Sequence, residues 1–195
     1  MKLYHYYKPI VLQVEETSHA AFMPAITNLR DSYDHLIRVF SVKMGFKEAD
    51  RDSIDDNLRS AYSHLYRALY DTLDYWGIIL KERIIDLLDD MPAESITAVI
   101  PEYYREVRPF CNDVEKLFAK FRDDMNIGSI NFDDIDEYIE CVNKLEEHVN
   151  LIERNLSAMQ EHRIKIWWKD LRWVWVTIAA TAIGTIIGIF VGAVL

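Results

Sequence analysis

Glycine and proline are scarce in this chain of 195 residues, which contains six glycines and five prolines. Three of the glycines lie beyond residue 183, so the preceding part has very few residues that end helices or form turns. The segments between them are long, and their apolar residues recur at the 3-4 spacing of a helix. The sequence therefore predicts an all-α fold.

Cysteine is rarer still, with only Cys111 and Cys141. Their spacing matches no zinc motif, and we interpret both as reduced thiols in helical segments. The chain also lacks a glycine-rich phosphate loop, a Gly-x-Ser-x-Gly motif, a His-Glu-x-x-His motif and an EF-hand loop. We therefore predict no metal and no cofactor.

Basic residues are outnumbered, with 22 lysines and arginines against 32 acidic residues. Four of the basic residues and one of the acidic residues follow residue 162, which leaves residues 1–162 with a net charge of −13. Affinity for the phosphate backbone comes mainly from lysine and arginine. An acidic body therefore argues against a nonspecific nucleic-acid binder.

The final 23 residues contain no charged side chain. A helix needs about 20 residues to cross a hydrocarbon core of ~30 Å, so this segment is long enough to span a membrane. Aromatic and basic residues typical of a membrane interface surround its start. They are Trp167, Trp168, Lys169, Arg172, Trp173 and Trp175. We predict a tail-anchored, single-pass protein with membrane lipid as a partner. Its N-terminal domain is expected in the cytosol, because the flanking basic residues lie only on the N-terminal side of the span.

Small residues recur every four positions along the span and indicate a helix-packing face. They are Ala180, Gly184, Gly188 and Gly192, beside a parallel line of threonines at 177, 181 and 185. Such a face lets two helix backbones approach closely, and threonine hydroxyls can hydrogen-bond between helices. We predict a homo-oligomer or a contact with another, unknown membrane protein.

The remaining helices are predicted from periodicity and from glycine and proline positions. Residues 1–13 are aromatic and partly β-branched, which predicts an extended arm or a short strand. A first helix is expected over residues 15–44, with Gly45 as its stop and with Pro24 as either a kink or the true start. Further helices are expected over residues 52–90 and 101–125, followed by a turn at residues 126–129.

A heptad pattern runs from residue 135 to the basic residues before the span. Its apolar positions are Ile135, Tyr138, Val142, Leu145, Val149, Ile152, Leu156 and Met159. The pattern fits one helix of an intramolecular bundle or a coiled coil between chains. No glycine or proline interrupts the helix until Gly184, so we predict one rod over residues 132–195. The expected organisation is a bundle (1–130), a heptad stalk packed on it (131–166), and a collar with a transmembrane helix (167–195).

One helix carries a polar line that has two interpretations. Asn57, His64 and Asp71 are seven residues apart and fall on nearly the same side of a helix. The line is either the polar edge of a bundle, with His64 held by Asp71 or a neighbouring helix, or part of a catalytic site.

Arg59 and His64 have the spacing Arg-x4-His, which resembles the HEPN superfamily of helical domains. Its active members are metal-independent endoribonucleases that pair the Arg and His of two protomers. The resemblance implies that Arg59 stabilises charge on a phosphate, that His64 acts as general acid or base, and that RNA is a partner. Ser60 departs from the polar Asn or Asp that commonly follows the family's Arg.

Residues 166–172, Ile-Trp-Trp-Lys-Asp-Leu-Arg, resemble the juxtamembrane segment of vesicle R-SNAREs. That resemblance implies a membrane tether. The heptads here cover about half of a SNARE motif and lack its central Arg or Gln layer.

Our leading interpretation is a non-enzymatic, self-associating membrane protein with a cytosolic interaction domain. By analogy with HEPN-like helical effectors we place it in a prokaryotic or phage-defence setting. A membrane-bound endoribonuclease and a SNARE-like tether are the alternatives.

Overall fold

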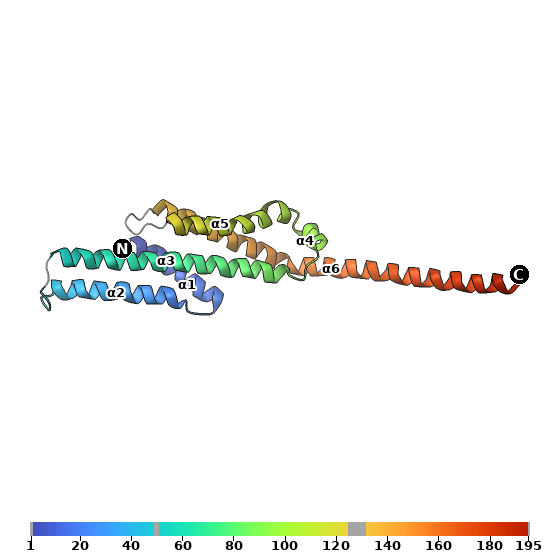
Figure 1. Ribbon diagram of the computed structural model, residues 1–195, viewed down its shortest axis with the longest axis horizontal. Helices are drawn as coiled ribbons and strands as arrows, with labels where there is room; N and C mark the ends of the chain where they lie inside the picture. The colour runs from blue at the N-terminus through green and yellow to red at the C-terminus, as the bar shows by residue number, and fades with distance from the viewer. Residues whose placement is uncertain (1, 49–50, 125–131, 195) are drawn as a thin grey trace.

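The computed structural model describes residues 2–48, 51–124 and 132–194, and every regular element in these ranges is a helix. The elements are α1 (Lys2–Ser18), α2 (Met23–Lys43), α3 (Arg51–Leu88), α4 (Ala93–Val99), the π-helix η1 (Tyr103–Val107), α5 (Arg108–Asp124) and α6 (Phe132–Val194). Helix α3 lies at the centre and packs against α1, α2, α5 and α6 (Figure 1). The structure thus confirms the all-α prediction. The turn predicted at residues 126–129 lies outside the described residues.

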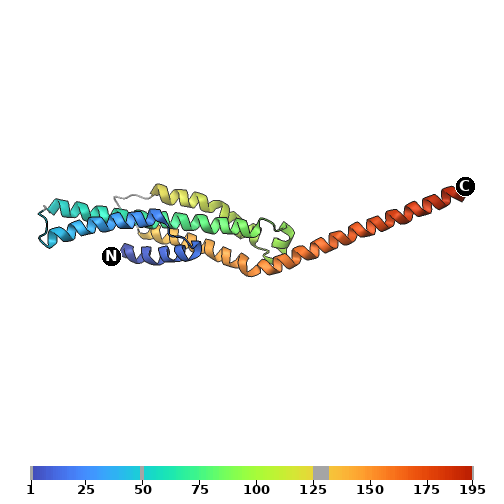
Figure 2. The same ribbon diagram turned by 90° about the horizontal axis from the view of Figure 1, so that it is seen from below.

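Helix α6 is a single element of 63 residues, as the lack of internal breakers predicted. Its first half belongs to the bundle and its second half projects away from every other helix, with a bend where it leaves the bundle (Figure 2). The heptad positions from Ile135 to Ile152 and at Met159 are buried in the core, and Leu156 packs against it. Helices of the same chain therefore cover the heptad stripe, which agrees with the intramolecular interpretation.

The prediction of an extended arm or a short strand at residues 1–13 is wrong, because residues 2–13 form most of α1. Leu3, Tyr7, Ile10 and Val14 are spaced by four, three and four residues, and all are buried in the core. Packing of this stripe on α3 outweighs the strand preference of the aromatic and β-branched residues. Pro9 lies within the helix and is exposed, so the helix continues without its backbone donor.

The single helix predicted over residues 15–44 is in fact two helices. His19 has a left-handed φ of 53°, which ends α1 and turns the chain back. Phe22 caps α2 in an extended conformation, and Pro24 occupies its first turn, where a missing N–H costs nothing. The alternative that Pro24 marks the start is therefore confirmed. Gly45 follows α2 with a φ of +78°, as expected for a helix stop.

The helix predicted over residues 101–125 begins differently, and α4 before it was not predicted. Pro101 disfavours a helical conformation at Ile100, whose φ is −125° and ψ is 81°, so α4 ends there. The chain resumes as η1, one π-turn that leads directly into α5. Pro109 has no N–H to donate into the preceding turn, which accounts for the irregular start.

A polar cluster at the edge of the core is built around the partly buried carboxylate of Asp74. The Tyr138 hydroxyl donates a hydrogen bond to Asp74 Oδ1, and Arg122 Nη1 lies 3.4 Å from Asp74 Oδ2. Burial, together with this carboxylate, raises the pKa of Tyr138 well above its usual range, so the phenol stays protonated. Phe121 stacks on the Tyr138 ring with centroids 4.5 Å apart. These contacts join α3, α5 and α6 near the start of α6.

Candidate functional site

Among the described residues, the hydrogen bonds between the bundle and α6 that lie farthest along α6 are made by His162 and Arg163. The His162 ring nitrogen Nδ1 lies 3.3 Å from the hydroxyl oxygen of Ser95, and Arg163 donates to the carbonyl oxygen of Asp90 at 3.0 Å. Beyond these residues nearly every described side chain of α6 is exposed. Arg163 therefore marks where the bundle ends and the free part of the helix begins.

Four of the five tryptophans lie just beyond this point, and each is more than half exposed. They are Trp167 at 56%, Trp168 at 59%, and Trp173 and Trp175 at 62% each. Trp76, in the bundle core, is 1% exposed. The contrast shows that the bundle does not cover the aromatic residues at the start of the predicted span, and Lys169 and Arg172 are exposed among them. Tryptophan rings beside lysine and arginine suit the headgroup level of a bilayer.

The helix that follows is apolar on all its sides. Large side chains from Val174 to Ile189 are each about half exposed or more. A helix that is apolar all round is typical of a membrane span or of the core of a large protein. Within the described residues, α6 is the one helix long and apolar enough to cross a membrane, and the most apolar part of it is entirely unburied.

The threonine hydroxyls of the span find hydrogen-bond acceptors without a partner helix. Thr177, Thr181 and Thr185 each donate to the backbone carbonyl four residues earlier, at distances of 3.0, 2.9 and 2.9 Å. Each hydroxyl is therefore already bonded within its own helix, as a hydrocarbon environment demands. The hydroxyl oxygens can still accept a bond from a neighbour.

The small-residue face lies open in the single chain. Ala180 and Gly184 are exposed, and a Cβ added at Gly184 would meet no atom within 4 Å. Nothing inside this chain therefore requires glycine at that position. Gly188 and Gly192 belong to α6, but their surroundings lie outside the described part of the chain.

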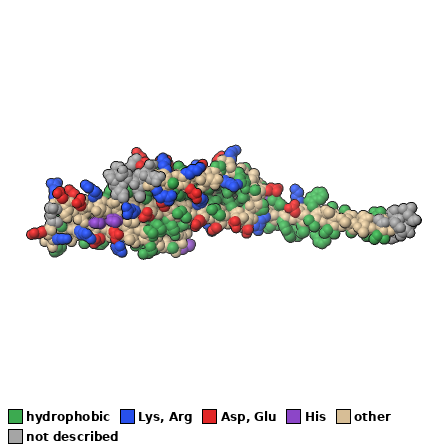
Figure 3. Space-filling model, viewed as in Figure 1, with side chains coloured by type: hydrophobic (Ala, Val, Ile, Leu, Met, Phe, Trp, Pro, Cys, Tyr) green, Lys and Arg blue, Asp and Glu red, His purple; other side chains and the backbone are tan. Residues whose placement is uncertain are grey.

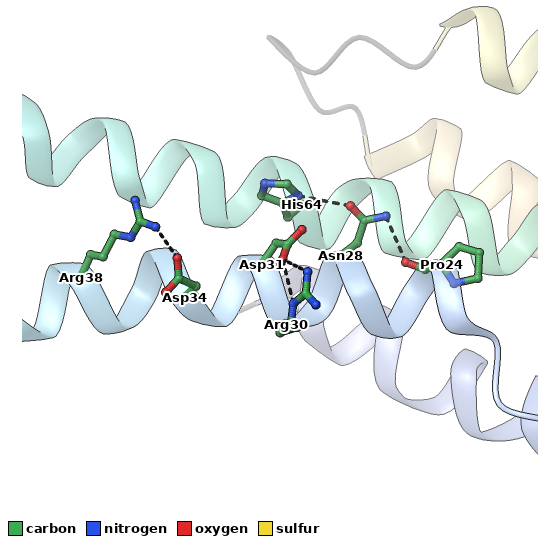
Figure 4. A network of polar contacts seen from close by, with 7 residues as sticks. All are labelled: Pro24, Asn28, Arg30, Asp31, Asp34, Arg38 and His64. Carbon is green, nitrogen blue, oxygen red and sulfur yellow. Dashed lines mark hydrogen bonds and ion pairs between the residues drawn. The ribbon is translucent and has the colours of Figure 1, made fainter.

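The polar line on α3 faces α2, and His64 is held there by Asn28 (Figure 4). The Asn28 amide nitrogen donates to the carbonyl of Pro24 and to Asp71, both at 3.2 Å. The amide oxygen must then face His64, whose Nδ1 is 3.2 Å away and is the donor. His35 repeats the arrangement, with Nδ1 2.9 Å from the oxygen of Asn57. The imidazole rings of His35 and His64 stack, with their centroids 5.5 Å apart.

These contacts agree with the interpretation of the line as a polar edge between helices, with His64 held by a neighbouring helix. Asp71 is half-buried, and burial raises the pKa of its carboxyl despite the nearby charge of Arg67. Asn28 could not be linked to this line from the sequence, because it lies 36 residues from His64.

Arg59 lies apart from this network. Its side chain is exposed, whereas His64 is half-buried against α2. No hydrogen bond or ion pair within the described ranges joins the two residues, and an offset of five positions places them about 140° apart around α3. The ribonuclease role of Arg59 and His64 stays a prediction. Among the described residues no group of His, Cys, Asp and Glu side chains has the geometry to hold a metal ion.

A second exposed apolar surface was not predicted from the sequence. It lies on α2 and the first part of α3, and forms a groove of about 920 Å³ that reaches the N-terminal end of α1. The signal was present in the sequence as apolar residues at 26, 29, 33, 36, 37 and 40, a helical stripe along α2.

No family model, no curated protein and no solved structure matches this chain.

Proposed function

We propose that this chain is a membrane protein that holds an acidic helical domain at the cytosolic surface and self-associates through its C-terminal helix. The observation that carries the proposal is the exposure of apolar side chains around the whole circumference of α6 beyond residue 172. Lipid is the environment in which such a helix is stable. Its threonine hydroxyls bond within the helix, which removes the cost of placing them in hydrocarbon.

The charge distribution supports the orientation. The basic residues between 163 and 172 attract an anionic leaflet by roughly 1 kcal/mol each, and they favour the cytosolic side. The body of net charge −13 is repelled by the same leaflet. Helix α6 projects the span away from the bundle (Figure 1). The acidic bundle can therefore lie outside the membrane while the span lies within it. The bundle would then stand off the membrane on a helical stalk.

Self-association is assigned to the span because the heptad stripe is already buried within the chain. A coiled coil between chains through Leu145 and Ile152 would require the bundle to open. The small-residue face needs no such change, since Gly184 has open space beside it.

Membrane insertion is tested with the full chain in cells. We expect it to stay with membranes after alkaline extraction, and a protease added to the cytosolic side should digest an N-terminal epitope. Replacing Ile183 and Ile187 with lysine should release the chain to the soluble fraction. Release of the unaltered chain by alkaline extraction would refute the anchor.

Self-association is tested by replacing Gly184 and Gly188 with leucine. The bulkier side chains should separate the helices and lower the dimer fraction in detergent or liposomes, with membrane binding unchanged. Ile186→Leu with Ile189→Leu is the matched control, because these residues lie on the opposite side of the helix. An equal effect of both pairs would contradict the assignment of the face.

The endoribonuclease, the SNARE-like tether and the defence setting stay predictions. The structure offers no observation that favours any of them over the anchored, self-associating bundle.

A further inference from the structure

The α2–α3 hairpin extends beyond the rest of the bundle at the end away from α6's C-terminus. Both views show its turn beyond the ends of α1, α5 and α6 (Figure 1; Figure 2). We call residues 23–67, which comprise α2 and the first part of α3, the arm. The two helices of the arm approach closely at buried Ser32, whose hydroxyl donates to the carbonyl of Ala61 at 2.7 Å. The arm is therefore a tightly joined helix pair, and the N-terminal end of α1 borders it at Tyr4 and His5.

One face of the arm is apolar and open. Tyr33 on α2 is 63% exposed, and Leu58 and Tyr62 on α3 are 42% and 38% exposed. They line the groove of about 920 Å³ together with Ile26 and Leu65. Ile37 and Phe40 continue the exposed apolar surface toward the turn. Figure 3 shows apolar side chains along the projecting helix, whereas the side of the arm that it displays is mostly polar and charged.

The area is large enough for a stable contact. Six large side chains of this face are between 36% and 63% exposed, namely Ile26, Tyr33, Ile37, Phe40, Leu58 and Tyr62. Together they present on the order of 500 Å² of surface, since a large side chain buries about 150–250 Å² when fully covered. A standard interface buries about 800 Å² on each partner, of which a little over half is apolar. The apolar area exposed on the open face of the arm is therefore comparable to the apolar area that one partner buries in a standard interface.

The charges of the arm indicate what covers it. The arm contains seven basic and seven acidic residues, so the net charge of −13 in residues 1–162 lies entirely outside it. Arg30 lines the groove and is paired with Asp31 at 2.8 Å, and Arg38 is paired with Asp34 on the same helix (Figure 4). Elsewhere two copies of the domain repel each other, whereas two arms approach without net repulsion.

From these observations we infer that the arm docks against the arm of a second copy of this chain, and that the two hairpins form a four-helix bundle with two-fold symmetry. An antiparallel helix pair with one open apolar face is half of such a bundle. In a membrane the two chains of this dimer would lie parallel, with both arms pointing away from the bilayer. This orientation rests on the membrane anchor proposed above. The arm contact itself does not depend on it.

The experiment measures the oligomeric state of the full chain in liposomes by counting photobleaching steps. It uses the Gly184→Leu, Gly188→Leu background, so that the span no longer supplies a contact. We expect dimers to remain in this background, with a higher apparent dissociation constant than the unaltered chain because the span contact is lost. Adding Tyr33→Glu should raise the apparent dissociation constant by at least about a hundredfold, because it places two carboxylates at a desolvated apolar interface. Leu58→Glu, on the other helix of the arm, should act in the same way.

Thr27→Glu is the matched control, because it adds the same charge at an exposed position on the opposite side of α2. It should leave the dimer intact. The near-ultraviolet circular dichroism of buried Trp76 verifies that each variant is folded. A background variant that is already monomeric would overturn the arm contact and leave the proposed glycine face in place. Dimers that persist with both Tyr33→Glu and Leu58→Glu would also overturn it.

Discussion

Replacing Leu145 with alanine tests whether the heptad helix belongs to an intramolecular core. Leu145 is 0% exposed within a single chain, at a heptad position of the half of α6 that packs against α3, α4 and α5. Truncating a fully buried leucine removes its transfer free energy and leaves a cavity, so we expect a loss of about 3 kcal/mol in the free energy of unfolding. The contacts that are lost lie inside one chain, so the loss should not depend on protein concentration.

The measurement is urea unfolding in excess detergent, monitored by the fluorescence of Trp76. The four exposed tryptophans are first replaced with phenylalanine, so that the signal reports only the core. In the Tyr33→Glu, Gly184→Leu, Gly188→Leu background, in which neither proposed dimer contact remains, the urea midpoint should not change over about a hundredfold range of protein concentration, as mass action requires for a unimolecular transition. Asn143→Ala, at an exposed position of the same helix, should change stability by less than about 0.5 kcal/mol.

Two results would refute the reasoning. A loss below about 1 kcal/mol would mean that Leu145 is not tightly packed in the core. A midpoint that rises with protein concentration would mean that the heptad stripe is buried between chains, as in a coiled coil.

Two further predictions follow from the core. Gly77→Ala should destabilise the fold by about 1–3 kcal/mol in the same urea unfolding assay, because an added Cβ would overlap the ring of Phe118. Gly184→Ala, in open space, should be neutral or stabilising. His148 is half-buried beside Lys144, and burial lowers its pKa below the ordinary 6.5. The unfolded chain therefore takes up the proton more readily, so stability is unaffected by this group above pH 6.5 and falls as the pH drops below it. His148→Leu should flatten the stability profile below pH 6.5, and an unchanged profile would contradict this.

Several elements were predictable because their signals are local. The end of α2 at Gly45, the extent of α3 and the continuity of α6 each depend on residues within one segment. The heptad stripe was predictable for the same reason, although its periodicity left open whether its partner was the same chain. The alignment of Asn57, His64 and Asp71 also followed from helix geometry alone.

Other features depended on distant partners. The aromatic and β-branched residues of α1 favour a strand by propensity, yet Tyr7 and Val14 form a helix because α3 offers a surface for their stripe. His64 is held by Asn28, which no spacing rule connects to it. Ile100 leaves the helical conformation beside Pro101, and the short helix before it depends on packing against α6.

The sequence by itself determined that the chain is helical and that its last part is apolar on every side, because periodicity and composition are properties of one segment. Only the tertiary structure decided which apolar stripes are buried within the chain and which stay exposed. It buries the heptad stripe of α6 inside the bundle and leaves the arm and the C-terminal helix uncovered. The physical reason is that an apolar stripe is buried only when another element packs against it. A stripe that has no partner in its own chain is free to contact lipid or a second copy.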